Sequence, residues 1–253
     1  MSTSLMHVVL SLTDTSPALD RSGVVEATHY ATLAEIAGRR GRTYWLLARG
    51  FAEAPSHALF GELIAALGPV NPAESLSDET AAFADAMQAA LRADVASDVL
   101  AIEFTRLFGG ISQTYGGLPP FESVVRTGNW GGDMVLEVLA AYADADIAPP
   151  LPEASPADHL AAELRFLAIA CHRESEAWQA DDIQMAMDWV RRERDFLDQH
   201  VLRWVPEYCQ KATGMAETPF YRSLLSLMPR ACALDREDID AILESVPAFA
   251  ADV

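Results

Sequence analysis

Residues 98–125 read DVLAIEFTRLFGGISQTYGGLPPFESVV, and they join a helix-like segment to a loop rich in glycine and proline. The first part carries bulky apolar side chains at helical spacing, which predicts a helix with one apolar face. These residues are Val99, Leu100, Phe104, Leu107 and Phe108. Gly109 and Gly110 then predict the end of that helix. The following loop keeps apolar residues beside Pro119 and Pro120, which is typical of a loop that packs on the core or faces a partner. This loop is therefore the first candidate for function.

A second stretch, residues 155–167, reads SPADHLAAELRFL and predicts the start of another helix. Ser155 suits the N-cap and Pro156 suits the first helical position. Asp158 stands where a capping-box carboxylate reaches back to the start of a helix. We therefore expect a helix that begins near Ser155 and carries Asp158 and His159 in its first turn.

The composition indicates a folded, strongly acidic protein. The chain has 253 residues, of which 51% are hydrophobic, and a formal net charge of −19. Such a surface repels phosphate, so a nucleic-acid partner is excluded and a cationic partner is favoured. Arginine supplies every basic residue except Lys211. The acidity therefore has two interpretations, a functional acidic face or an adaptation of composition to salt.

Cysteine usage and hydropathy predict a cytoplasmic protein. Cys171, Cys209 and Cys232 are widely spaced and form no C-x-x-C pair, which fits a reducing compartment. The first basic residue is Arg21, so the apolar run at residues 5–12 lacks the positive leader of a secretory signal. No apolar run has the length of a membrane span.

Apolar residues recur at helical spacing from residue 24 onward, and no alternating strand pattern appears. We predict an all-α, single helical-bundle domain of nine or ten helices over residues 24–253, after a flexible arm at residues 1–23. Three prolines between residues 144 and 156 predict a hinge and a possible sub-division into two halves.

Individual residues predict where several helices begin and end. Ser56 and Thr218 are expected N-caps, and the helix after Thr218 is expected to run to Met228. Asp235 is expected to cap a separate last helix. Pro206 is expected to kink or restart the helix that carries Trp204, because proline removes a helical hydrogen bond.

Four motifs occur in a fixed order: F-x-x-L-F-G at residues 104–109, P-P-F-E-S at 119–123, D-H-x-x-x-E-L-x-F-L at 158–167 and H-x-x-x-W-x-P at 200–206. Pro219, Phe220 and Tyr221 follow them. This combination resembles the TorD/DmsD-like cytoplasmic chaperones, which mature molybdenum enzymes of the dimethyl sulfoxide reductase type. The resemblance extends over residues 31–228. One departure is Val125, where relatives often carry an aromatic residue.

The resemblance implies a chaperone that is not an enzyme. No residue pattern predicts a cofactor or metal of its own, and the sequence does not decide whether a nucleotide or the molybdenum cofactor binds. Its partners would be the twin-arginine signal peptide and the apo catalytic subunit of a molybdopterin oxidoreductase, held until the cofactor is inserted before export. The sequence does not name the client, nor does it decide between a monomer and a homodimer that exchanges halves at the hinge. The expected peptide-binding residues are Phe104, Leu107, Phe108, Pro119, Pro120, Phe121, Glu122, Ser123, Asp158, His159 and Glu163.

Within this set we expect a division of labour on one helix, with Phe108 in the core and Leu107 lining the peptide groove beside Pro120 and Phe121. The resemblance places Asp158 and His159 at the border of that groove, where the carboxylate would meet an arginine of the peptide. Without the resemblance, a helical apolar stripe is core, Asp158 is a helix cap and His159 is a surface residue.

Two alternatives from other classes remain. One is an all-α metal-dependent or acid/base enzyme that uses Asp158 and His159, although no nucleophile stands nearby in the sequence. The other is a structural helical scaffold. His and Cys residues are too scattered for a metal site, no phosphate-binding glycine motif occurs, and Ser123 lacks the glycines of a nucleophile elbow.

Overall fold

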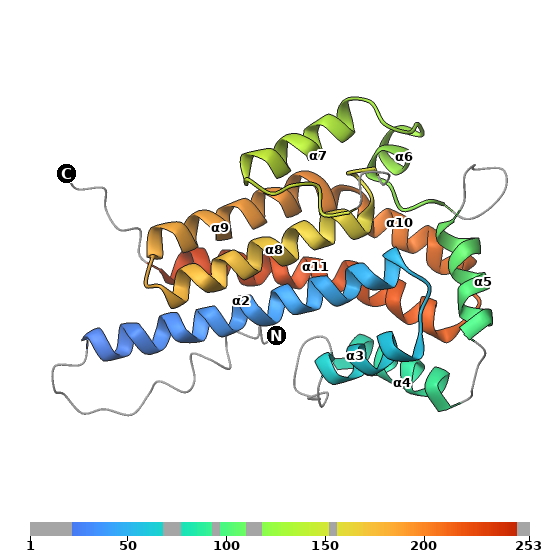
Figure 1. Cartoon of the computed structure of the whole chain (residues 1–253), viewed down its shortest axis with the longest axis horizontal. Helices are drawn as coiled ribbons and strands as arrows, with labels where there is room; N and C mark the ends of the chain where they lie inside the picture. The colour runs from blue at the N-terminus through green and yellow to red at the C-terminus, as the bar shows by residue number, and fades with distance from the viewer. Residues whose placement is uncertain (1–21, 68–76, 93–96, 110–117, 152–155, 247–253) are drawn as a thin grey trace.

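The computed structural model describes residues 22–67, 77–92, 97–109, 118–151 and 156–246. Within these ranges it contains ten α-helices, one short π-helical turn and no strand, only an isolated bridge between Phe121 and His159. The all-α prediction is confirmed (Figure 1). Almost all of the predicted N-terminal arm lies outside the described residues.

The helices are α2 (Ser22–Ala52), α3 (His57–Leu67), α4 (Ser77–Arg92), α5 (Ser97–Phe108), α6 (Glu122–Thr127), α7 (Asp133–Asp144), α8 (Leu160–Gln179), α9 (Ile183–Phe196), η1 (Leu197–Val201), α10 (Leu202–Met215) and α11 (Pro219–Ser245). Here η1 denotes the π-helical turn, which runs directly into α10.

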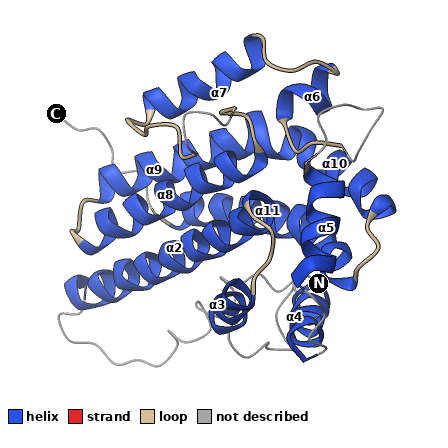
Figure 2. Ribbon diagram, turned by 45° about the vertical axis from the view of Figure 1, so that its right-hand side comes forward, coloured by secondary structure: helices blue, strands red, loops and turns tan. Residues whose placement is uncertain are grey.

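The long helices α2, α8, α9 and α11 form the centre of the molecule. Helix α2 packs along α8, which packs against α9, while α11 contacts α2, α9 and α10. Helices α3 and α4 lie on one side of this bundle, and α6 and α7 lie on the opposite side (Figures 1 and 2). One continuous apolar core runs from Leu33 in α2 to Val246 after α11. Residues from both ends of the chain therefore share one core, and the hinge at residues 144–156 stays a prediction.

Gly41 lets α2 pack tightly against α8. A Cβ atom on Gly41 would lie 3.1 Å from the carbonyl oxygen of Ala168 and 3.2 Å from Cβ of Cys171. Gly38 and Gly41 do not interrupt α2, because burial along α8 outweighs their low helix propensity.

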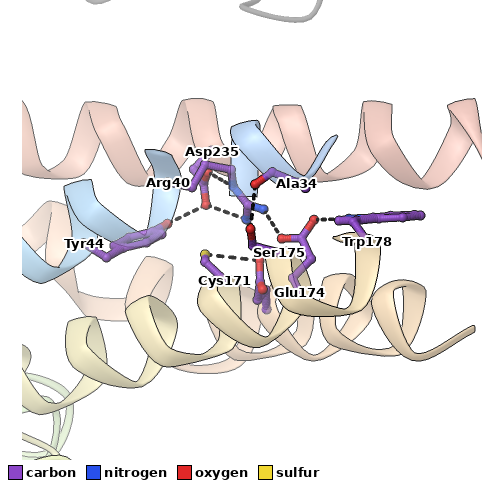
Figure 3. Close-up of polar contacts among 9 residues, drawn as sticks. Ala34, Arg40, Tyr44, Cys171, Glu174, Ser175, Trp178 and Asp235 are labelled. Carbon is purple, nitrogen blue, oxygen red and sulfur yellow. Dashed lines mark hydrogen bonds and ion pairs between the residues drawn. The ribbon is translucent and has the colours of Figure 1, made fainter. Parts of the chain in front are cut away.

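A buried arginine ties α2 to three other helices (Figure 3). The guanidinium of Arg40 donates to Glu174 of α8 at 2.7 Å, to Glu193 of α9 at 2.6 Å and to Asp235 of α11 at 2.5 Å. The Tyr44 hydroxyl donates to Asp235 at 2.6 Å. Burial, which disfavours charge, raises the pKa of both Glu174 and Glu193. One cation thus holds together carboxyl groups from three helices.

The predicted helix starts have different outcomes. The Ser56 hydroxyl accepts from the Leu59 N–H at 3.2 Å, and the Thr218 hydroxyl accepts from the Tyr221 N–H at 3.4 Å, so both N-caps are confirmed. The separate last helix capped by Asp235 was a wrong prediction. Asp235 lies in the middle of α11, and its carboxylate bonds Arg40 and Tyr44 instead of a helix start.

Prolines inside helices explain two further differences. Helix α11 continues past the predicted end at Met228 and contains Pro229, because Met228 and Cys232 are fully buried on either side of it. This burial outweighs the hydrogen bond that proline removes. Pro206 lies inside α10, and the irregular turn is η1, which ends five residues before the proline.

Candidate peptide-binding site

Two of the sequence motifs meet through main-chain hydrogen bonds. The Leu160 N–H donates to the Pro120 carbonyl at 2.8 Å, and the Glu122 N–H donates to the Asp158 carbonyl at 3.0 Å. Between these bonds Phe121 and His159 form the isolated antiparallel bridge. We call the pairing of residues 120–123 with residues 158–160 the junction. It brings together segments that the sequence keeps more than thirty residues apart.

Asp158 caps helix α6 rather than helix α8, which it precedes in the sequence. Its side chain is 1% exposed, and Oδ2 accepts from the Ser123 N–H at 2.9 Å in the first turn of α6. This carboxylate is therefore a buried part of the junction rather than an acidic rim, which corrects the expectation that it faces a peptide arginine directly.

The helix after the junction starts later than predicted. Helix α8 begins at Leu160, so Pro156 is not its first residue, and Ser155 lies outside the described residues. His159 is the N-cap instead, because its Nδ1 atom accepts from the Ala161 N–H at 3.0 Å. Local sequence suggested Ser155, but the pairing with Pro120 fixes the chain up to Leu160 and delays the helix.

The imidazole of His159 is half-buried and held neutral. Burial lowers its pKa from 6.5 to about 4, and the nearby Arg165 guanidinium contributes to the same shift. A neutral ring is also what the cap needs, because Nδ1 accepts a hydrogen bond only when it carries no proton.

Beneath the junction lies a group of buried acidic side chains. Glu122 and Glu163 are both 0% exposed. The carboxylate of Glu122 accepts from Arg126 at 2.6 Å, and its second oxygen lies 3.0 Å from Nδ1 of His200. Glu163 accepts from the Trp204 indole N–H at 3.1 Å. Burial raises the pKa of Glu163, and the nearby negative charge of Glu122 raises it further.

These contacts explain the fourth motif. His200 and Trp204 belong to H-x-x-x-W-x-P, and they hold the two glutamates that the junction buries. Helices α6, α8 and α10 therefore meet at one polar cluster together with η1. Sequence reasoning identified the motif by resemblance but assigned no role to His200 or Trp204.

The first motif lies in the core. Leu107 is 1% exposed and Phe108 is 6% exposed, while Phe104 is partly buried against the same core. The ring of Phe108 packs against Phe51, Phe104 and Tyr221 at centroid distances of 5.3 to 5.4 Å. The predicted division of labour was therefore wrong for Leu107, because both positions of the L-F pair are buried. The loop at residues 110–117 lies outside the described residues.

An aromatic surface leads away from the junction. The ring of Phe121 lies 4.9 Å from His159 on one side and 4.3 Å from Trp130 on the other. Phe121 is 8% exposed, whereas Trp130 is 51% exposed. Trp130 was not among the predicted site residues, although N-W-G-G at residues 129–132 places a bulky aromatic in a glycine turn.

Of the eleven predicted residues, the structure gathers seven at the junction and its buried cluster. These are Pro120, Phe121, Glu122, Ser123, Asp158, His159 and Glu163. Pro119 adjoins them, and its carbonyl accepts from the Phe121 N–H at 2.9 Å. Phe104, Leu107 and Phe108 instead support the bundle.

The enzymatic alternatives find no support in these contacts. Asp158 Oδ2 accepts from the Ser123 N–H and His159 Nδ1 accepts from the Ala161 N–H, so both side chains hold the backbone in place. Within the described ranges, one group has metal-ligand spacing: Cys171, Glu174 and Glu193. The Arg40 guanidinium already provides the cation for both of these glutamates.

None of the described helices combines the length and the apolar composition that crossing a membrane requires.

Comparison with known proteins places the chain in a family. The model of the nitrate reductase delta subunit family matches residues 73–210. The TorD chaperone of Vibrio parahaemolyticus is 28% identical over 207 residues, which cover 78% of this chain and 93% of that protein. The TorD chaperone of Vibrio vulnificus strain YJ016 is 27% identical, with 79% and 94% covered.

A solved structure, that of a putative redox enzyme maturation protein from Archaeoglobus fulgidus, superposes with a TM-score of 0.43 at 18% identity, covering 79% of this chain and 93% of that one. The family match alone spans more than half of the chain, and the curated relatives are chaperones. The chain therefore belongs to the nitrate reductase delta subunit family, and it is a TorD-like chaperone rather than an enzyme.

Proposed function

We propose that this chaperone matures a molybdopterin oxidoreductase of the dimethyl sulfoxide reductase type and binds the twin-arginine signal peptide of that client. It works in the cytoplasm, where it withholds the signal peptide from the export machinery and keeps the apoenzyme open until the cofactor is inserted.

One observation carries the proposal: the P-P-F-E-S, D-H and H-x-x-x-W motifs meet at the junction. The first two pair through Leu160 N–H and the Pro120 carbonyl, and the third holds the buried glutamates beneath them. Motifs from three parts of the chain thus support one small surface, which ends in the exposed ring of Trp130.

Two physical properties fit this surface to a twin-arginine leader. The net charge of −19 attracts the arginine-bearing segment of the peptide. The half-buried ring of His159 and the exposed ring of Trp130, which both pack against the buried Phe121, offer an apolar surface for the segment that follows. Asp158 and Ser123 then act as positioning residues, since their mutual hydrogen bond fixes the start of α6.

The direct test is binding of a synthetic twin-arginine leader, measured by fluorescence anisotropy. We expect a Kd on the order of micromolar or tighter, with affinity that falls as salt rises because ionic contacts are screened. A leader with both arginines changed to glutamine is the control. Equal affinity for the two leaders would contradict the proposal. Failure of the protein to bind either leader would also contradict it and would indicate a purely structural scaffold.

Two variants of Asp158 separate its positioning role from its charge. Asp158→Asn keeps an oxygen that accepts from the Ser123 N–H, whereas Asp158→Ala removes the acceptor. We expect Asp158→Ala to lose about 1 to 2 kcal/mol of stability and also peptide affinity, as loss of a cap does. The Asn variant should bind almost as well as the wild type. An equal loss of affinity in both variants, with normal melting, would make the charge itself the recognition element.

A further inference from the structure

All five tryptophans of the chain lie in described residues, and four of them have a polar or cationic partner. Two of the four are buried and use their indole N–H groups. Trp178 donates to Glu174 at 2.9 Å, and Trp204 donates to Glu163 at 3.1 Å. Their faces and edges are enclosed by the core, since both are at most 1% exposed.

The next two tryptophans have an arginine over the ring. The guanidinium carbon of Arg165 lies 5.2 Å from the centroid of Trp45. Those of Arg173 and Arg192 lie 5.1 Å and 5.6 Å from the centroid of Trp189. A guanidinium over an indole face is attracted by the electron density of the ring, and tryptophan provides the strongest such attraction.

Trp130 is the fifth, and it differs from the others. Its side chain is 51% exposed, and its ring packs against Phe121. Among the described residues it has neither an acceptor for its indole N–H nor a guanidinium over its ring. Because a tryptophan ring offers a large apolar area and is enriched at interfaces, this half-exposed indole is a candidate contact for a partner.

The loop that carries Trp130 is built to present it. Gly128, Gly131 and Gly132 have φ angles of +76° to +79°, a backbone region that favours glycine. The Gly131 N–H donates to the buried Ser123 hydroxyl at 3.2 Å, which ties the loop to the junction. The position of Trp130 is therefore set by the same residue that Asp158 holds.

Arg126, the nearest arginine in the sequence, does not fill this place. Arg126 lies at the end of α6, and its guanidinium is committed to the buried Glu122 at 2.6 Å. The open ring of Trp130 therefore has room for a cation from outside the chain, and the net charge of −19 attracts one.

We propose that Trp130 is a specificity-determining residue that stacks on the guanidinium of one arginine of the client's signal peptide. The inference rests on the proposed function and deepens it, since it names the residue that distinguishes arginine from other cations. A planar guanidinium stacks on an indole face, whereas the ammonium of lysine acts as a strongly hydrated point charge.

The test compares three leaders, with paired arginines, paired lysines or paired glutamines, on four proteins. The proteins are the wild type, Trp130→Leu, Trp130→Phe and the matched control Trp45→Leu. Trp45 is a suitable control because it is 46% exposed, close to the value for Trp130, but already carries Arg165 over its ring. Anisotropy gives the affinities, and circular dichroism confirms that each variant is folded.

We expect the wild type and Trp45→Leu to prefer the arginine leader over the lysine leader. Trp130→Leu should lose roughly tenfold in affinity for the arginine leader, which lies between the values for an exposed and a desolvated cation–π contact, and with it the preference over lysine. Trp130→Phe should lie between them. If Trp130→Leu does not fold, an unchanged preference in Trp130→Phe overturns the inference.

The outcomes separate this inference from the function on which it rests. If the wild type binds no leader, the proposed function fails. If the wild type discriminates against glutamine but Trp130→Leu keeps the full preference for arginine over lysine, the proposed function stands and the role of Trp130 is overturned. An equal loss for the arginine and lysine leaders also overturns it, because that loss would reflect apolar contact alone.

Discussion

Among single residues, His159 has a clear pH signature. Its Nδ1 accepts from the Ala161 N–H, and burial lowers its pKa from 6.5 to about 4. Between these values the unfolded chain binds the proton more readily than the folded one. The free energy of unfolding should therefore be highest above pH 6.5 and decrease as the pH falls towards 4, by at most about 3 kcal/mol for a shift of this size.

Chemical denaturation from pH 4 to pH 7, together with NMR titration of the His159 ring, measures this effect. His159→Asn is the matched control, because its amide oxygen can cap α8 without titrating. We expect this variant to flatten the pH dependence. If the free energy of unfolding depends on pH equally in His159→Asn and in the wild type, another group causes that dependence.

Residues also show what local sequence can reveal. Ser56 and Thr218 were predicted correctly as caps because a cap bonds a backbone N–H only three residues away. Asp158 and Asp235 were misassigned because their partners are distant in sequence. Asp158 bonds the N–H of Ser123, and Asp235 bonds Arg40. A short polar side chain looks the same in both situations until the fold is known.

At the scale of a helix, α5 provides a test of the corrected assignment. Leu107 is 1% exposed and Ile102 is 69% exposed on the same helix. Leu107→Ala should cost about 2 to 5 kcal/mol of stability, as deletion of a buried side chain does. Ile102→Ala, the matched control, should have little effect because its side chain is already in water. Thermal melting of both variants measures the difference, and equal melting temperatures would refute the burial of Leu107.

The helices themselves were largely predictable, whereas their faces were not. Helical periodicity shows that Phe104, Leu107 and Phe108 share a stripe, but it does not show how the stripe is rotated against its neighbours. The structure turns Phe108 towards Phe51 and Tyr221, and it leaves Leu107 buried as well. The expected groove-lining role failed for this reason.

At the scale of the whole molecule, the Arg40 contacts join α2 to α8, α9 and α11. Arg40→Met would leave Glu174 and Glu193 buried without their cation. We expect a loss of about 3 to 5 kcal/mol, the usual cost of removing one partner from a buried ion pair. Addition of Glu193→Gln should recover part of this loss, since it removes one of the unpaired charges. Denaturant unfolding of the single and double variants measures the coupling.

A matched control is Arg49→Met, which removes an arginine of the same helix that pairs with the exposed Glu53. Surface pairs of this kind contribute about 0 to 1 kcal/mol, so this variant should unfold nearly as the wild type does. Comparable losses in Arg40→Met and Arg49→Met would mean that burial adds nothing to the Arg40 contacts.

The site was predictable only at the level of segments. Resemblance selected P-P-F-E-S and D-H, and the structure pairs them. The burial of Asp158, the roles of His200 and Trp204 and the exposure of Trp130 depend on how α6, α8 and α10 approach one another. No pattern within a single segment encodes that approach.

The junction also closes the chain between residues 120 and 160 into a loop. The backbone leaves the bundle at Pro120 and returns at Leu160, and one main-chain hydrogen bond of 2.8 Å joins the two ends. Between them α7 is anchored by the buried Tyr142, whose hydroxyl donates to the Ala157 carbonyl at 2.9 Å. The turn at Gly128, Gly131 and Gly132 is open, since an added Cβ there would meet no atom within 4 Å. These glycines are therefore kept for their positive φ angles rather than for lack of space, and variation in what the turn presents is left to Asn129 and Trp130, the exposed residues between them.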